Sequence, residues 1–116
     1  MNDNFIIHKN ETSFGYVWHI VYKPGIGLVS VELDNDNVFT VYGLSVIESE
    51  RNKGIGKSLL AKVEEIAKEN NVTLINVNIE KEHKELVDYY KKLGYNIDYV
   101  NYESEYYYMS KSLNNF

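Results

Sequence analysis

The sequence has no cysteine, and it has no hydrophobic run long enough to cross a lipid bilayer. The lack of cysteine excludes a disulfide framework and catalysis by a thiolate. The first ten residues also lack the charged and apolar regions that make up a signal peptide. These absences lead us to expect a cytoplasmic protein that does not associate with a membrane.

Positive charge is scarce. Lysine and arginine together number 12 against 17 aspartates and glutamates, which gives a formal net charge of -5 at pH 7. Because nucleic-acid binding generally requires a basic surface, we expect no nucleic-acid partner. The three histidines (His8, His19 and His83) are dispersed without metal-ligand spacing, so no metal site is predicted. The remaining composition, 44% hydrophobic and 25% charged, is that of a globular protein with one domain over residues 1–116.

The first half of the chain predicts strands, because alternating, β-branched and aromatic residues dominate it. A short strand is expected at Phe5–His8. Three longer strands are expected at Tyr16–Lys23, Gly27–Asp34 and Val38–Val46. Short turns separate the longer strands, which indicates an antiparallel meander.

The second half predicts a helix, a strand and a second helix. Residues Ile55–Glu69 carry Leu59, Val63 and Ile66 at helical spacing, so one face of this helix is apolar. The next strand is expected at Leu74–Ile79. A strand–helix–strand crossover makes that strand parallel to the one before the helix.

A second helix is expected at Lys84–Leu93, with Leu86, Val87, Tyr90 and Leu93 on its apolar face. Gly94 suits the position just after the helix end. The chain then predicts a closing hairpin of Asn96–Tyr102 and Glu105–Ser112. The resulting fold class is α+β, with a mostly antiparallel mixed sheet, one parallel strand pair and two or more helices.

Candidate binding residues gather in the turn between the third long strand and the first helix. Gly54 and Gly56 lie at the predicted start of the helix, where amide groups lack backbone acceptors and the helix dipole favours anions. Arg51, the only arginine in the chain, precedes them and offers a planar fork for phosphate. Lys53 and Lys57 add two more positive charges, so the turn predicts an anion site.

Three phosphate-binding motifs compete for this turn. The nucleotide P-loop requires glycine at the position of Arg51, and the dinucleotide motif requires glycine at the position of Leu59. The third pattern, R/Q-x-x-G-x-G/A, is matched in full by Arg51-Asn-Lys-Gly54-Ile-Gly56. It resembles the acetyl-CoA pyrophosphate loop of the GNAT N-acetyltransferase superfamily. A glycine-containing turn with solvated lysines remains the simplest structural alternative.

The resemblance extends over residues 38–113. LVDYYKKLGY at 86–95 is similar to the second-helix signature of the GNAT family and places Tyr90 at the tyrosine of that signature. YYYMSKSL at 106–113 is similar to the closing strand. The chain departs from the family at Glu48, where proline is common, at Asn52, where glycine is common, and at His83, where an asparagine often contacts the cofactor. It also lacks room between His8 and Tyr16 for the two helices that usually help to wall the acceptor site.

The resemblance implies that acetyl-CoA is the cofactor. Pantetheine would lie as a short extra strand between Leu44–Val46 and Val77–Ile79, with its pyrophosphate on the amides of Asn52–Lys57. The predicted cofactor-binding residues are Leu44, Ser45, Val46, Arg51, Asn52, Lys53, Gly54, Ile55, Gly56, Lys57 and His83.

The resemblance also implies transfer of an acetyl group to a primary amine. Tyr90 matches the tyrosine that protonates the departing thiolate. Glu80 is the first candidate for the base, with Glu48 and Glu32 as alternatives. The missing helices predict an open acceptor site that takes a small amine, a polyamine or a protein lysine or N-terminus, in a monomer or homodimer. The alternative is a non-catalytic module that keeps the fold and binds CoA or another protein.

Overall fold

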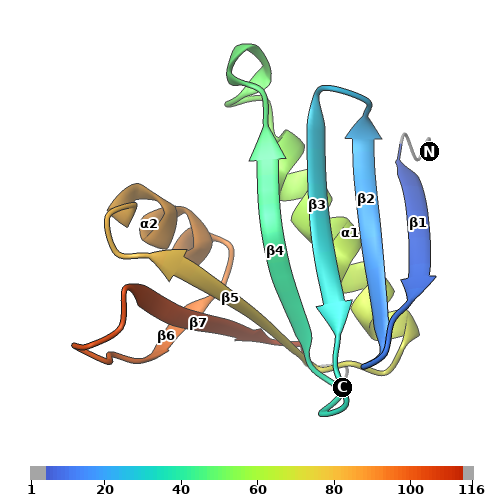
Figure 1. Ribbon diagram of the computed structural model, residues 1–116. Coiled ribbons are helices and arrows are strands. Elements are labelled where there is room, and N and C mark those ends of the chain that lie inside the picture. Colours follow the sequence, from blue (N-terminus) through green and yellow to red (C-terminus); the bar gives the residue numbers. More distant parts are fainter. Residues whose placement is uncertain (1–4, 114–116) are drawn as a thin grey trace.

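The computed structural model describes residues 5–113. The elements follow in the order shown in Figure 1: β1 (Ile6–Glu11), β2 (Tyr16–Lys23), β3 (Gly27–Leu33), β4 (Phe39–Val46), the 3₁₀ helix η1 (Glu48–Glu50), α1 (Ile55–Glu69), β5 (Leu74–Glu80), α2 (Lys84–Lys92), β6 (Asn96–Tyr99) and β7 (Tyr106–Ser112).

The strands form one seven-stranded sheet in the order β1-β2-β3-β4-β5-β7-β6. Neighbouring strands are antiparallel except β4 and β5, which are parallel and joined through α1. This confirms the predicted α+β class, the meander and the parallel crossover. The first strand is longer than predicted, because the tight turn at Thr12–Gly15 lets β1 pair with β2 along its whole length.

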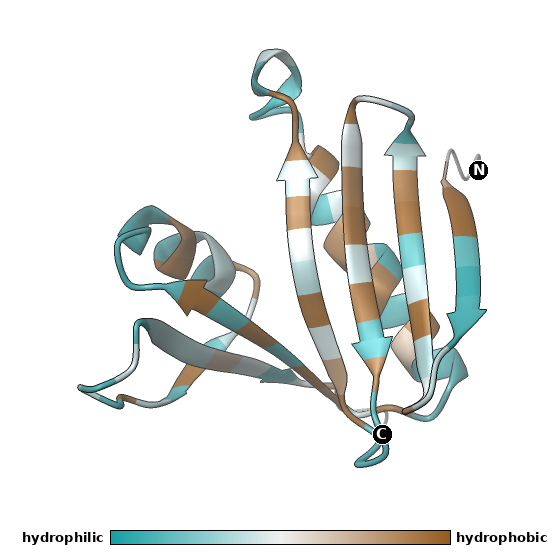
Figure 2. Ribbon diagram, in the orientation of Figure 1, coloured by the Kyte–Doolittle hydropathy of each residue, from teal (hydrophilic) through white to brown (hydrophobic). Residues whose placement is uncertain are grey.

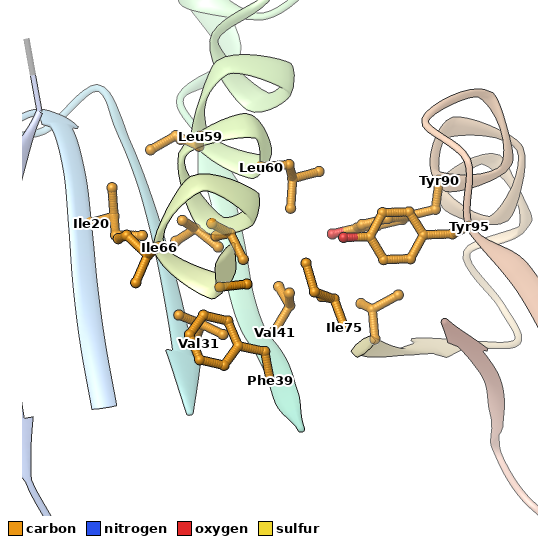
Figure 3. Close-up of a cluster of buried hydrophobic side chains, with 14 of the residues drawn as sticks. Ile20, Val31, Phe39, Val41, Leu59, Leu60, Ile66, Ile75, Tyr90 and Tyr95 are labelled. Carbon is orange, nitrogen blue, oxygen red and sulfur yellow. The ribbon is translucent and has the colours of Figure 1, made fainter. Parts of the chain in front are cut away.

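Helix α1 covers one face of β2, β3 and β4 and buries the stripe that the sequence predicts (Figure 1). Leu59 and Val63 are completely buried, and they face strand residues that are equally buried, such as Val31 and Phe39. Figure 3 shows Leu59, Val31 and Phe39 among the side chains packed between the helix and the sheet. The continuous apolar face of α1 therefore fixes the helix on the meander.

Helix α2 lies against β5 and contributes a smaller apolar face. Val87 and Tyr90 are buried, whereas Leu86, predicted on the same face, is 39% exposed because the buried arc of this short helix is narrow. The helix ends at Lys92, and Gly94 follows with a φ of 99°, the left-handed conformation expected of a residue after a helix. Strand β6 ends at Tyr99, before the predicted Tyr102.

The opposite face of β1–β4 is not covered by any helix in the described part of the chain (Figure 1). Figure 2 shows hydrophobic and hydrophilic bands alternating along β2, β3 and β4, as expected for strands with one face in the core. We call the uncovered face of β1–β4 the open face. None of the described helices is long and apolar enough to cross a membrane.

Candidate active site

The parallel strands β4 and β5 pair over only three residues. Phe39–Val41 pair with Ile75–Val77, after which β4 continues to Val46 and β5 to Glu80 without pairing to each other. We call this divergence the fork; it is visible between β4 and β5 in Figure 1. The backbone groups along the inner edges of the fork are available to an extended ligand that carries amides.

A β-bulge in β4 begins at the fork. Ser30 pairs with Tyr42 and Leu28 with Ser45, so Gly43 and Leu44 together face Val29 alone. Gly43 has a φ of 58°, which glycine adopts without a steric penalty. The sequence analysis missed this bulge, although a single glycine inside a strand pattern is its usual signal.

The turn before α1 leaves amides free at the start of the helix. Asn52 and Gly54 have φ values of 65° and 83°, and the helix starts at Ile55. The first hydrogen bond of the helix is donated by the Ser58 amide to the Gly54 carbonyl, at 3.0 Å. The amides of residues 55–57 therefore have no helical acceptor and form an anion-binding end.

The three cations of the turn differ in their surroundings. Arg51 Nε donates to the carbonyl oxygen of Val46 at 2.9 Å, which ties the turn to the end of β4. Lys53 Nζ lies 3.3 Å from a carboxylate oxygen of Glu50, and Lys57 is exposed. The positive charges and free amides at this turn suit an anionic group such as a phosphate.

Gly56 is the point where α1, α2 and β4 meet. A Cβ at this position would lie 2.6 Å from the Tyr89 hydroxyl and 3.8 Å from a methyl group of Leu44. The tyrosine hydroxyl that reaches the turn is thus that of Tyr89. Sequence reasoning did not single out Tyr89, and its only signal was its position beside Tyr90 in the helix signature.

Tyr90 lies deeper in the molecule. Its side chain is 3% exposed, and its ring packs edge-on against Tyr95 and Tyr89, with centroids 5.2 and 5.5 Å away. Figure 3 shows the hydroxyl groups of Tyr90 and Tyr95 directed from the α2 side toward Leu60 and Ile75. Burial raises the pKa of Tyr90 well above its ordinary value, so its hydroxyl stays protonated.

The carboxylates proposed as bases lie in three places. Glu80 is exposed at the end of β5, where its carboxylate is close to Glu82 and His83. Glu48 is exposed in η1. Glu32 lies on β3 and accepts a hydrogen bond of 2.6 Å from the Tyr42 hydroxyl. This bond, together with burial and the charge of Glu32, raises the pKa of Tyr42 to about 12.

His83 precedes α2 at its N-cap position. Its imidazole nitrogens lie 3.6 and 3.5 Å from carboxylate oxygens of Glu82 and Glu85. The structure therefore brings the predicted pyrophosphate residues together at one turn and places Leu44–Val46 on the inner edge of the fork. His83 belongs to the α2 side.

The sequence matches the model of the acetyltransferase (GNAT) family over residues 3–95, and the chain belongs to this family. It is 34% identical over 73 residues to the uncharacterized protein YxbD of Bacillus subtilis (strain 168). That match covers 63% of this chain and 44% of YxbD, so the chain spans less than half the length of this relative.

Solved acetyltransferase structures share the fold at low sequence identity. The PaiA N-acetyltransferase of Thermoplasma acidophilum, solved with coenzyme A, is 18% identical with a TM-score of 0.71, and the match covers 83% of this chain and 59% of PaiA. A GNAT acetyltransferase of Elizabethkingia anophelis with acetyl-CoA bound is 17% identical with a TM-score of 0.69, over 97% of this chain and 100% of the other. The IAA acetyltransferase of Bacillus cereus ATCC 14579 is 18% identical with a TM-score of 0.70, over 94% and 99%.

Proposed function

We propose that this protein is an acetyl-CoA-dependent N-acetyltransferase that acetylates a primary amine. The observation that carries the proposal is the alignment of the fork with the free amides at the start of α1. Arg51 joins the two features, because its side chain bonds the last carbonyl of β4. An extended pantetheine arm along β4 would lead to a pyrophosphate on the turn.

The glycines of the turn fit such a ligand. Gly54 adopts a left-handed conformation, and a Cβ there would meet no atom within 4 Å. The backbone at Gly54 is therefore open to solvent in a left-handed conformation, as expected where a phosphate approaches the chain closely. Membership of the GNAT family and the CoA-bound relatives support the same assignment.

The transfer requires a neutral amine. At pH 7 the deprotonation of an amine with a lysine-like pKa costs roughly 4–5 kcal/mol, so a base beside the fork would help. We assign this role to Glu80, because alternation along β5 places its side chain on the open face, opposite the buried Ile79. The amine nitrogen then attacks the thioester carbonyl carbon, and the carbon–sulfur bond breaks.

We assign Tyr90 as the acid that protonates the departing sulfur. Its raised pKa keeps the proton on the hydroxyl at neutral pH, and its ring is held by Tyr89 and Tyr95. The protons balance if the nitrogen loses two of them: one to Glu80 before attack and one after the carbon–nitrogen bond has formed. The second would restore the proton that Tyr90 gives to the sulfur, and Glu80 would release the first to solvent.

The test is release of CoA thiol from acetyl-CoA with a panel of primary amines. Release that depends on both the protein and the amine would support the enzyme. If the protein binds acetyl-CoA and no amine accelerates release above the buffer rate, the chain is a non-catalytic CoA-binding module. If it does not bind acetyl-CoA either, the cofactor assignment is also wrong.

A further inference from the structure

The strand register places side chains of β1–β4 in rows across the open face. One row contains Ile6, Val21, Leu28 and Ser45, which are successive partners from strand to strand. A cavity of about 510 Å³ lies over this row. Pro24–Gly27 of the β2–β3 turn and Ile47 complete its lining, together with His8. Its volume lies in the usual range for small-molecule sites, and its lining is mostly apolar.

The cavity lies beside the fork. Ser45, at the end of the apolar row, belongs to the segment of β4 that extends beyond the last pair with β5. Because α1 and α2 occupy the other side, the open face is the side from which a second substrate has access to the fork. The cavity is therefore in the right place to hold part of the acceptor.

The neighbouring row on the same face is polar. It contains His8, His19, Ser30 and Tyr42, again as successive strand partners. Tyr42 is the first residue of β4 beyond its pairing with β5, and its hydroxyl donates to the carboxylate of Glu32. The side chains of His19 and Ser30 bond each other at 2.8 Å. Glu32 lies four residues from Leu28 along β3, about 13 Å at 3.3 Å per strand residue, so its charge is beyond the reach of a small amine held in the cavity.

We propose that the open face is an acceptor site for a primary amine joined to a compact apolar group. The apolar group occupies the cavity over Ile6, Val21 and Leu28. The amine nitrogen is oriented toward Ser45, in the part of β4 that extends beyond its pairing with β5. This inference rests on the proposed function. It narrows the acceptor from amines in general to arylalkyl or branched alkyl amines, in preference to polyamines.

The test compares 2-phenylethylamine with spermidine as acceptors, and Ile6→Asn with Ile7→Asn as variants. Ile6 and Ile7 are neighbours in β1 with similar exposure, 46% and 40%, but their side chains lie on opposite sides of the sheet. Only Ile6 lines the cavity. Each variant disturbs the same edge strand, so Ile7→Asn controls for loss of stability.

We expect 2-phenylethylamine to have a higher kcat/KM than spermidine. Ile6→Asn should lower that value for 2-phenylethylamine about tenfold, because a polar side chain replaces an apolar contact, whereas Ile7→Asn should leave it near the wild-type value. The Kd for acetyl-CoA should be unchanged in both variants.

Preference for spermidine, or equal effects of Ile6→Asn and Ile7→Asn, would overturn the inference. Binding of 2-phenylethylamine can be monitored directly through shifts of the amide resonances of β1–β4. Because this measurement does not need turnover, it separates failure of the acceptor site from failure of the proposed function. Binding that depends on Ile6 without any turnover would keep the cavity as an amine site and reject the enzyme. Lack of binding at millimolar amine would reject the site.

Discussion

Tyr95 carries a buried hydroxyl group that is unpaired within residues 5–113. Its side chain is 1% exposed, and its hydroxyl finds no hydrogen-bond partner among the described residues. An unpaired buried hydroxyl costs about 1–3 kcal/mol. Tyr95→Phe removes the hydroxyl and keeps the ring contact with Tyr90. We therefore expect a gain of about 1 kcal/mol in the free energy of unfolding at pH 7, measured by urea denaturation.

The same tyrosines predict a loss of stability in alkali. Burial raises the pKa of Tyr95, with a further contribution from Glu64, and burial raises that of Tyr90. Because the pKa in the folded state exceeds the unfolded value of about 10, the unfolded chain loses these protons first. The free energy of unfolding should be steady below that pH and fall above it. The free energy of unfolding of Tyr95→Phe should fall less steeply with pH. Identical slopes for the variant and the wild type would contradict a raised pKa for Tyr95.

Tyr89 and Tyr90 allow a matched test of the acid. Tyr90→Phe should lower kcat by roughly ten- to a thousandfold, the range for losing a general acid, with little change in the Kd for acetyl-CoA. Tyr89→Phe removes a neighbouring hydroxyl that lies against Gly56, so it should act mainly on cofactor affinity. Steady-state kinetics and calorimetry on the two variants distinguish these effects. If the kcat of Tyr90→Phe equals that of the wild type, Tyr90 is a core residue and does not act as the acid.

Among the elements, α1, α2 and β4 approach one another closely at Gly56. Gly56→Ala should gain up to about 1 kcal/mol of helix propensity, but its Cβ would lie 2.6 Å from the Tyr89 hydroxyl. We expect a lower melting temperature for Gly56→Ala. In the Tyr89→Phe background the same change should be neutral or stabilising, which a double-mutant cycle measures. Additive effects would show that the hydroxyl does not limit this position.

The elements that the sequence predicts well are those with a long apolar stripe. Helix α1 has the predicted bounds, because Leu59, Val63 and Ile66 recur at helical spacing next to a glycine start. The bulge at Gly43 shifts the alternation of β4 by one residue, so the apolar positions change from Phe39 and Val41 to Leu44 and Val46. An interpretation of the whole segment as one regular strand misses this shift. The exposure of Leu86 depends on how α2 sits on β5, which local sequence does not determine.

The candidate site could be predicted only where its residues are neighbours in the sequence. The pyrophosphate turn is contiguous, so Arg51, Gly54 and Gly56 carry their signal within six residues. The open-face cavity collects side chains from four strands that are far apart in the chain, from Ile6 to Ile47. Likewise, the contact between Gly56 and Tyr89 joins two helices and follows from tertiary packing alone.

At the scale of the whole molecule, one sheet separates two environments. Helices α1 and α2 pack on one side of it, and the open face of β1–β4 lies on the other. The fork connects the two sides where β4 leaves β5. This arrangement would let acetyl-CoA bind along the fork with its pyrophosphate at α1 while an amine approaches from the open face. The absence of the usual helices between β1 and β2 leaves that approach open.

Acetyl-CoA is proposed to bind at the fork and at the start of α1 together. Calorimetric titration of acetyl-CoA into the wild-type protein and into Arg51→Ala tests this binding most directly. We expect one site with a Kd in the micromolar range, equivalent to about -8 kcal/mol. Affinity should weaken by about 1–3 kcal/mol in Arg51→Ala, through loss of a charged hydrogen bond. A wild-type protein that gives no binding heat with acetyl-CoA at several temperatures would contradict this binding site.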